Sequence, residues 1–141
     1  MNRFTENIID EVKNKAQQKS LQVNNMVKAV ELEIDPDKMR QVLLNMIDNA
    51  IEASDEYGII ELISIVNEER NKFSLKIKNG CTEMPDIGKI FVPFYTSKVS
   101  GTGLGLSISR NIVKQHHGEI TLSGIHENQI EFTVILPVTR S

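Results

Sequence analysis

Four polar side chains that can bind a cation through oxygen recur along one predicted helix. Because an α-helix turns 100° per residue, Asn45, Asp48, Asn49 and Glu52 share one stripe, opposite an apolar one. Carboxamide and carboxylate oxygens suit magnesium, which often takes only one or two protein oxygens alongside waters and substrate phosphates. A solvated helix face is the simpler interpretation of the same pattern. The stripe therefore predicts a magnesium site only in combination with a second signal.

That second signal is a glycine-rich turn immediately before another predicted helix. Residues 100–106 read Ser-Gly-Thr-Gly-Leu-Gly-Leu. Glycine lets the backbone approach a ligand closely, and the free amides and partial positive charge of a helix N-terminus attract anions. Lys98 adds a positive charge nearby. The turn favours polyphosphate binding, but glycine also serves tight turns, and both the ending of a P-loop and the preceding strand of a Rossmann fold are missing.

Hydrophobic periodicity predicts the elements that must position these residues. Residues 1–20 form an amphipathic helix ending near Lys19, and residues 21–34 form two short strands joined by a turn at Asn24 and Asn25.

A long helix that carries the polar stripe follows. Asp35 caps its free amides, Pro36 fits its first position, and Gly58 marks its exit. The remaining periodic segments predict strands at 59–66 and 73–78, a helix reaching residue 116 and ended by Gly118, and strands at 120–123 and 130–136. Residues 79–105 show no periodicity and are predicted to form a lid.

This order predicts an α/β fold with helices on one face of a mixed, mostly antiparallel sheet. The 141 residues fit one domain, and the formal charge of -3 does not favour a nucleic-acid partner. Cys81 is the only cysteine, which excludes an intrachain disulfide and fits a reducing compartment. No apolar run is long enough to cross a bilayer, so we expect this piece to be cytoplasmic and without membrane contact.

Two segments resemble a known family. Residues 45–53, Asn-Met-Ile-Asp-Asn-Ala-Ile-Glu-Ala, are similar to the asparagine box of the GHKL ATPases, the group of gyrase, Hsp90, histidine kinases and MutL. Residues 91–98 with residues 101–106 resemble the phenylalanine motif and second glycine box of sensor histidine kinases, and residues 117–120 continue that pattern. The resemblance covers essentially the whole chain and implies a two-layer α/β sandwich of the Bergerat type with a flexible ATP lid.

The resemblance also implies roles for individual residues. Asn49 would ligate magnesium, Asn45 would assist the metal or the phosphates, and Lys98 would contact phosphate from the lid, which makes these three the catalytic candidates. The nucleotide-binding candidates are Asn45, Asn49, Glu52, Asn79, Phe91, Thr96, Ser97, Lys98, Gly101, Thr102, Gly103, Leu104, Gly105 and Leu106. ATP and magnesium are the implied ligands.

Position 45 separates transfer from hydrolysis within this group. Its hydrolytic members place a glutamate that activates water four residues before the metal-binding asparagine, and this chain has Asn45 there. Phosphoryl transfer depends mainly on positioning and charge neutralisation. Donation of the γ-phosphate to a histidine therefore fits better than steady hydrolysis.

The first glycine box departs from the family pattern. Asp-x-Gly-x-Gly aligns with residues 79–83, Asn-Gly-Cys-Thr-Glu, so the aspartate and both glycines are replaced. Asn79 can accept a hydrogen bond from the adenine amino group, but more weakly than a carboxylate. Residues 86–88, Asp-Ile-Gly, lie too far from the preceding strand to replace the box.

The sequence predicts the ATP-binding catalytic domain of a bacterial sensor histidine kinase. Its partners would be a separate dimerisation and phosphoacceptor domain and, indirectly, a response regulator; the parent kinase could be anchored in a membrane. A stand-alone anti-sigma-factor serine kinase is a rival hypothesis, with the same fold and a similar length. A non-catalytic interaction module with poor nucleotide binding is a second rival, and a gyrase-like or MutL-like ATPase is a third.

His116 and His117, at a helix end, are predicted to be structural.

Overall fold

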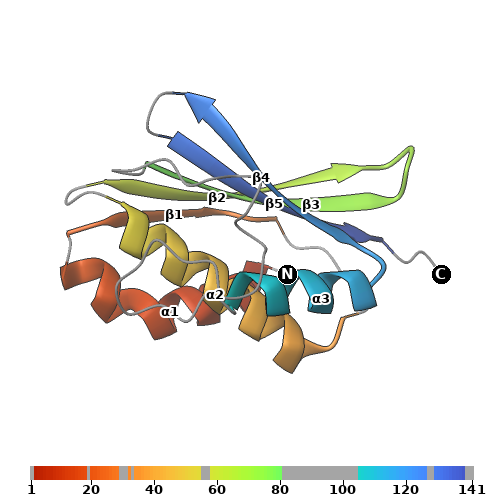
Figure 1. Cartoon of the computed structure of the whole chain (residues 1–141), viewed down its shortest axis with the longest axis horizontal. Coiled ribbons are helices and arrows are strands. Elements are labelled where there is room, and N and C mark those ends of the chain that lie inside the picture. The colour runs from red at the N-terminus through yellow and green to blue at the C-terminus, as the bar shows by residue number, and fades with distance from the viewer. Residues whose placement is uncertain are drawn as a thin grey trace.

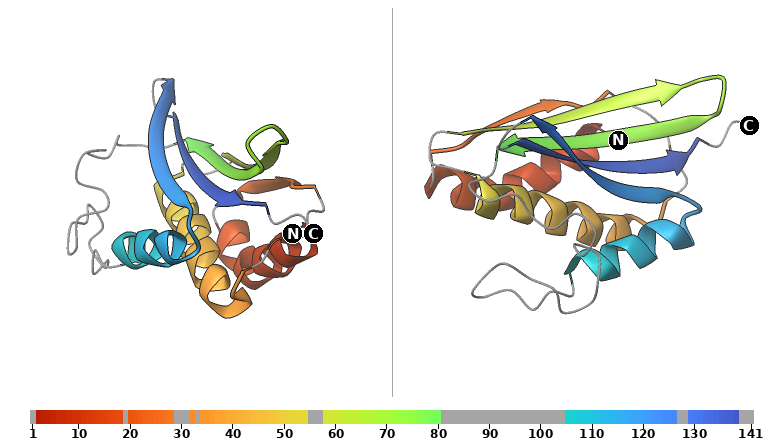
Figure 2. Two further views of the ribbon diagram at one scale, coloured as in Figure 1. Left: turned by 90° about the vertical axis from the view of Figure 1, so that its right-hand side faces the viewer. Right: turned by 45° about the horizontal axis from the view of Figure 1, so that its top comes forward.

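The computed structural model describes residues 2–18, 20–28, 32, 34–54, 58–80, 105–126 and 129–138. In these residues a five-stranded sheet lies over a layer of three helices (Figure 1). A second view from the side keeps all three helices on the same face of the sheet (Figure 2). The predicted two-layer α/β architecture is confirmed.

The helices are α1 (Asn2–Gln18), α2 (Pro36–Ala53) and α3 (Gly105–Gln115). The strands are β1 (Gln22–Met26), β2 (Ile59–Asn67), β3 (Lys72–Gly80), β4 (Glu119–His126) and β5 (Gln129–Pro137). Their order across the sheet is β1-β2-β3-β5-β4; β1 and β2 are parallel, and every other neighbouring pair is antiparallel. The mixed, mostly antiparallel sheet is as predicted.

The core lies between the sheet and the helices. β3 and β5 alternate strictly, burying Phe73 and Phe132 on the helix side with their neighbours at every second position. Met39, Met46 and Ile47 of α2 are fully buried against them. The apolar stripe predicted on this helix is the one that meets the sheet, which leaves its polar stripe on another side.

The strand pair predicted over residues 21–34 is wrong at its turn. Asn24 and Asn25 lie inside β1, where they pair with Glu61 and Leu62 of β2. Asn25 instead makes a turn-type hydrogen bond just past the strand, where its side-chain oxygen accepts from the backbone amide of Val27 at 3.1 Å. Residues 29–31 and 33, part of the predicted second strand, lie outside the described residues.

Two predicted boundaries also shift. Helix α2 ends at Ala53 rather than near Gly58, because Ser54 has an extended backbone (φ -79°, ψ 146°). The Ser54 amide makes the last helical bond, to the Ala50 carbonyl at 3.1 Å. The predicted lid loses its ends, since Asn79 and Gly80 belong to β3 and Gly105 belongs to α3. Residues 81–104 of that segment lie outside the described residues.

Candidate functional site

The N-terminus of α2 is fixed from two sides. The Asp35 carboxylate accepts from the amides of Asp37 and Lys38 at 3.1 and 3.3 Å, as the predicted cap requires. The amide of Asp35 itself donates to Nε2 of His116 at 3.0 Å, and Nδ1 of His116 lies 2.8 Å from the carbonyl oxygen of Ile112. A neutral ring protonated on Nδ1 satisfies both contacts. The predicted structural role of His116 is thus to join the end of α3 to the start of α2.

The predicted polar stripe lies on a partly exposed side of α2. Asn45, Asp48 and Asn49 are half-buried, and Glu52 is exposed. Half-buried side chains combine a restricted orientation with access to a ligand, whereas a purely solvated face would be exposed along its length. The stripe therefore offers carboxamide and carboxylate oxygens from neighbouring turns of one rigid helix.

Asn79 lies at the end of β3, beside the end of α2. Ser54, which caps α2, places its hydroxyl 2.6 Å from the carbonyl oxygen of Ala50 and 3.4 Å from that of Gly80. Asn79 is 1% exposed, and its side-chain nitrogen Nδ2 donates to the backbone carbonyl of Gly80 at 2.7 Å. Its buried side-chain oxygen has no hydrogen-bond partner in the part of the chain that the structure describes. A free acceptor thus stands next to the C-terminal turn of α2.

The start of α3 reaches the same region of α2. Leu106 is half-buried and packs against the core, and Ser109, one turn further on, is fully buried. The side-chain nitrogen of Asn45 donates to the Ser109 hydroxyl oxygen at 3.3 Å. The helix that follows the glycine-rich turn is therefore in direct contact with the asparagine-bearing helix.

Sequence reasoning missed Ser109. A polar residue at a buried position of the amphipathic pattern of residues 105–115 was the available signal, but its partner is 64 positions away in the chain. Of the predicted site, the structure brings together around α2 the residues Asn45, Asn49, Glu52, Asn79 and Leu106, and it places Gly105 at the first position of α3. The other candidates, Phe91, Thr96, Ser97, Lys98, Gly101, Thr102, Gly103 and Leu104, lie outside the described residues.

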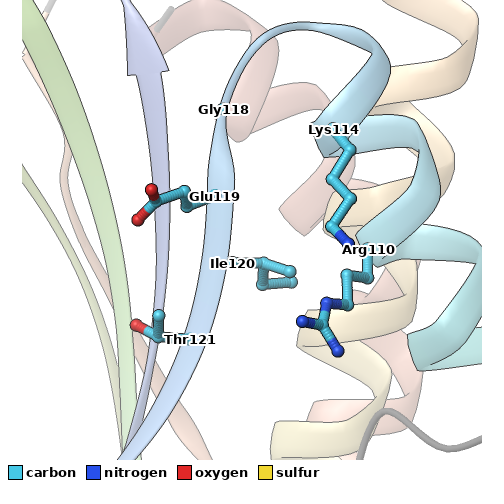
Figure 3. A pocket seen from close by; sticks show the side chains of 6 residues that line it. All are labelled: Arg110, Lys114, Gly118, Glu119, Ile120 and Thr121. Atoms are coloured by element: carbon cyan, nitrogen blue, oxygen red, sulfur yellow. The ribbon is translucent and has the colours of Figure 1, made fainter.

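A cavity of about 270 Å³ lies on the other side of α3 and shares no residue with this predicted site. It is lined by Arg110, Lys114, Gly118, Glu119, Ile120 and Thr121. Arg110 and Lys114 extend toward Ile120, while Glu119 and Thr121 turn to the opposite side of β4 (Figure 3). None of the described candidates for nucleotide binding lines this cavity, so we do not assign it to the nucleotide.

The described part of the chain lacks both a metal-binding cluster and a membrane-spanning helix. It contains no group of three or more histidine, cysteine, aspartate or glutamate side chains arranged to hold a metal ion. None of its helices has the length and apolar character that a membrane crossing requires.

Comparison with known proteins decides the family. Residues 34–140 match the family described as histidine kinase-, DNA gyrase B- and HSP90-like ATPase. The chain belongs to this ATPase family. The matched range contains α2, the polar stripe, Asn79 and α3, so the candidate site lies wholly within the ATPase domain.

Relatives of this ATPase domain include sensor kinases. Sensor histidine kinase ZraS of Escherichia coli O157:H7 is 37% identical over 108 residues, which are 77% of this chain and 24% of ZraS. Sensor histidine kinase WalK of Bacillus subtilis (strain 168) is 38% identical over 114 residues, which are 75% of this chain and 19% of WalK. The chain thus spans about a quarter or less of the length of these curated relatives.

Solved structures of the family share the fold. The catalytic domain of histidine kinase ThkA matches with a TM-score of 0.87 and 31% identity, covering 98% of this chain and 92% of that one. ThkA in complex with the response regulator protein TrrA matches with a TM-score of 0.81 and 28% identity, covering 99% of this chain and 40% of that one. The predicted resemblance to histidine kinase catalytic domains is confirmed.

Proposed function

We propose that this ATPase domain binds magnesium-ATP beside α2 and donates the γ-phosphate to a histidine on a separate phosphoacceptor domain. The observation that carries the proposal is the side-chain oxygen of Asn79, buried and without a hydrogen-bond partner among the described residues. Such a group costs about 1–3 kcal/mol if it stays unsatisfied. A ligand that donates a hydrogen bond there removes this cost.

The orientation of Asn79 selects the kind of base. Its amide nitrogen donates to the Gly80 carbonyl at 2.7 Å, and a flipped amide would set two acceptor oxygens against each other. The oxygen is therefore the side-chain atom left to accept a hydrogen bond. An acceptor in this place matches the amino group of adenine and opposes the carbonyl oxygen of guanine.

The oxygens of the stripe fit magnesium. We assign Asn49 as the protein ligand, with Asn45 and Glu52 on neighbouring turns facing the phosphates or the waters of the ion. Magnesium commonly keeps several waters and is bound through one or two protein oxygens plus substrate phosphates. When bound, the ion neutralises charge on the phosphates. Lys98 and the glycines of residues 101–105 supply the remaining phosphate contacts in this proposal.

The reaction is a transfer rather than a hydrolysis. An imidazole nitrogen of the acceptor attacks the γ-phosphorus, the bond from that phosphorus to the bridging oxygen breaks, ADP leaves, and the imidazole loses its proton. The chain's own residues hold the nucleotide in line and orient its phosphates, which is most of what this chemistry requires. Asn45 stands where a water-activating glutamate would be needed for hydrolysis.

The parent protein and its partners form part of the same proposal. The complex of ThkA with TrrA supports a response regulator as the eventual recipient of the phosphoryl group. The matched regions make up 24% of ZraS and 19% of WalK, and the remaining length of these relatives supports a dimerisation and phosphoacceptor domain elsewhere in the parent. Because ATP is the donor, we place the domain in the cytoplasm.

A chimera tests the transfer. We would replace the catalytic domain of ZraS, which is 37% identical over the matched region, with this chain and incubate the protein with γ-labelled ATP and magnesium. We expect label on the chimera that is stable in alkali and lost in acid, as phosphohistidine is, and no label when the chain carries Asn49→Ala. Acid-stable label would indicate a hydroxyl acceptor and a serine kinase. Steady phosphate release without labelled protein would contradict the proposal.

A further inference from the structure

Ser109 occupies an unusual position for a hydroxyl group. It lies one turn into α3, is fully buried, and shares its face of the helix with the buried apolar residues Ile112 and Val113. Burying a hydroxyl is unfavourable unless it is hydrogen-bonded. An alanine would pack α3 against α2 without that requirement, so the hydroxyl serves something other than packing.

One hydrogen-bond partner of Ser109 is a candidate site residue. The side-chain nitrogen Nδ2 of Asn45 donates to the Ser109 hydroxyl oxygen at 3.3 Å, and the two residues are 64 positions apart in the sequence. This distance is at the long end for a hydrogen bond, so the contact adds little to stability. What it does define is direction: with the nitrogen held on Ser109, the oxygen of the planar amide is fixed on the opposite side.

We propose that Ser109 is a positioning residue that orients the Asn45 carboxamide for the metal or the phosphates. This rests on the proposed nucleotide site and adds a residue that touches no ligand itself. Asn45 and Ser109 belong to two different helices, and α3 begins at Gly105, the last glycine of the turn. Ser109 therefore also sets the asparagine relative to the backbone that is proposed to hold the polyphosphate.

A second bond between the same helices provides the matched control. His116 joins the end of α3 to Asp35 at the start of α2, ten positions away from Asn45. His116→Ala and Ser109→Ala each remove one contact between α3 and α2. If Ser109 only held the helices together, the two variants would have the same effect on ligand binding.

The test is a double-mutant cycle read by calorimetric titration with a non-hydrolysable ATP analogue, with and without magnesium. The proteins are the unsubstituted chain, Ser109→Ala, Asn45→Ala, the double variant and His116→Ala. We expect Ser109→Ala to weaken magnesium-dependent affinity about 3- to 10-fold, with no further loss when Asn45 is already alanine. His116→Ala should lower the melting temperature and leave that affinity unchanged.

Several results overturn the inference. Unchanged magnesium-dependent affinity in Ser109→Ala, or a loss that simply adds to that of Asn45→Ala, would show that Ser109 does not act through Asn45. If Ser109→Ala does not fold, Ser109→Cys gives the same reading, since a thiol of similar size is a weak acceptor. Ser109→Thr keeps the hydroxyl and should retain the affinity. Absence of binding by the unsubstituted chain would instead remove the proposed function, and this inference with it.

Discussion

The buried amide of Asn79 leads to a prediction with two opposite effects. Asn79→Asp places a charged acceptor where the adenine amino group is proposed to bind, so affinity for an adenine nucleotide should rise. The same change removes the 2.7 Å bond to the Gly80 carbonyl and sets a carboxylate against that oxygen. The nucleotide-free variant should therefore lose about 1–3 kcal/mol of unfolding free energy. Titration and thermal unfolding measure the two effects, and equal or weaker affinity would mean that residues 79–83 are misaligned with the first glycine box.

Asn49 tests the metal site more directly. Asn49→Ala removes the assigned ligand from a half-buried position of α2, so the fold should persist while magnesium-dependent nucleotide affinity falls by about 10- to 100-fold or more. Asn111→Ala makes the same change at an exposed position of α3 and should leave affinity unaltered. If both variants bind alike, Asn49 is not the ligand.

Side-chain chemistry along one helix was predictable, and chemistry between helices was not. The stripe of Asn45, Asn49 and Glu52 follows from helix geometry alone, and Asp35 and Pro36 announce where that geometry starts. The bond from Asn45 to Ser109 and the bond from Asp35 to His116 join positions 64 and 81 residues apart. They depend on how α3 crosses α2, which local patterns do not encode.

The end of α3 shows how the elements themselves depart from simple rules. Gly118 was predicted to end this helix, but the residue with left-handed backbone is His117, at φ 61°. The amide of His117 donates to the Lys114 carbonyl and that of Gly118 to the Val113 carbonyl, both at 3.0 Å, which is the Schellman pattern with histidine where glycine is usual. Gly118 is needed for another reason: a Cβ there would lie 2.2 Å from the Ile135 carbonyl oxygen.

Substitutions at these two neighbours should therefore have opposite signs. His117→Gly removes the strain of a left-handed side-chain-bearing residue and should raise the free energy of unfolding by about 0.5–1 kcal/mol. Gly118→Ala forces β4 away from β5 and should lower it by about 2 kcal/mol or more. Chemical denaturation of both variants measures the difference, and a destabilised His117→Gly would contradict this account of the helix end.

In strand β1, pairing with a neighbouring strand overrides the local preference of the residues. Asn24 and Asn25 have strong turn preferences, yet both lie in a strand because their backbones pair with Glu61 and Leu62. The backbone hydrogen bonds with β2 outweigh the local turn preference of these two asparagines. The adjacent strands β2 and β3 were predicted to within one or two residues at each end, since a short turn joins them and their alternation is regular.

Across the domain, the layered architecture was predictable and the order of the strands was not. Amphipathic helices and half-apolar strands can only bury their apolar sides by packing one layer on the other, and Figure 1 shows these two layers. The sheet order β1-β2-β3-β5-β4 inserts β5 next to β3, and that pairing joins segments separated by α3 and β4. Through it, β3 lies in the middle of the sheet and ends with Asn79 beside α2.

Calorimetric titration of the chain with non-hydrolysable ATP and GTP analogues, each with and without magnesium, tests the central claim most directly. The stripe on α2 and the fixed acceptor of Asn79 predict binding of the ATP analogue that strengthens with magnesium, and at least about tenfold weaker binding of the GTP analogue. Equal affinity for both bases would contradict the role of Asn79. No binding of either analogue would contradict the nucleotide site as a whole and would identify the domain as an interaction module.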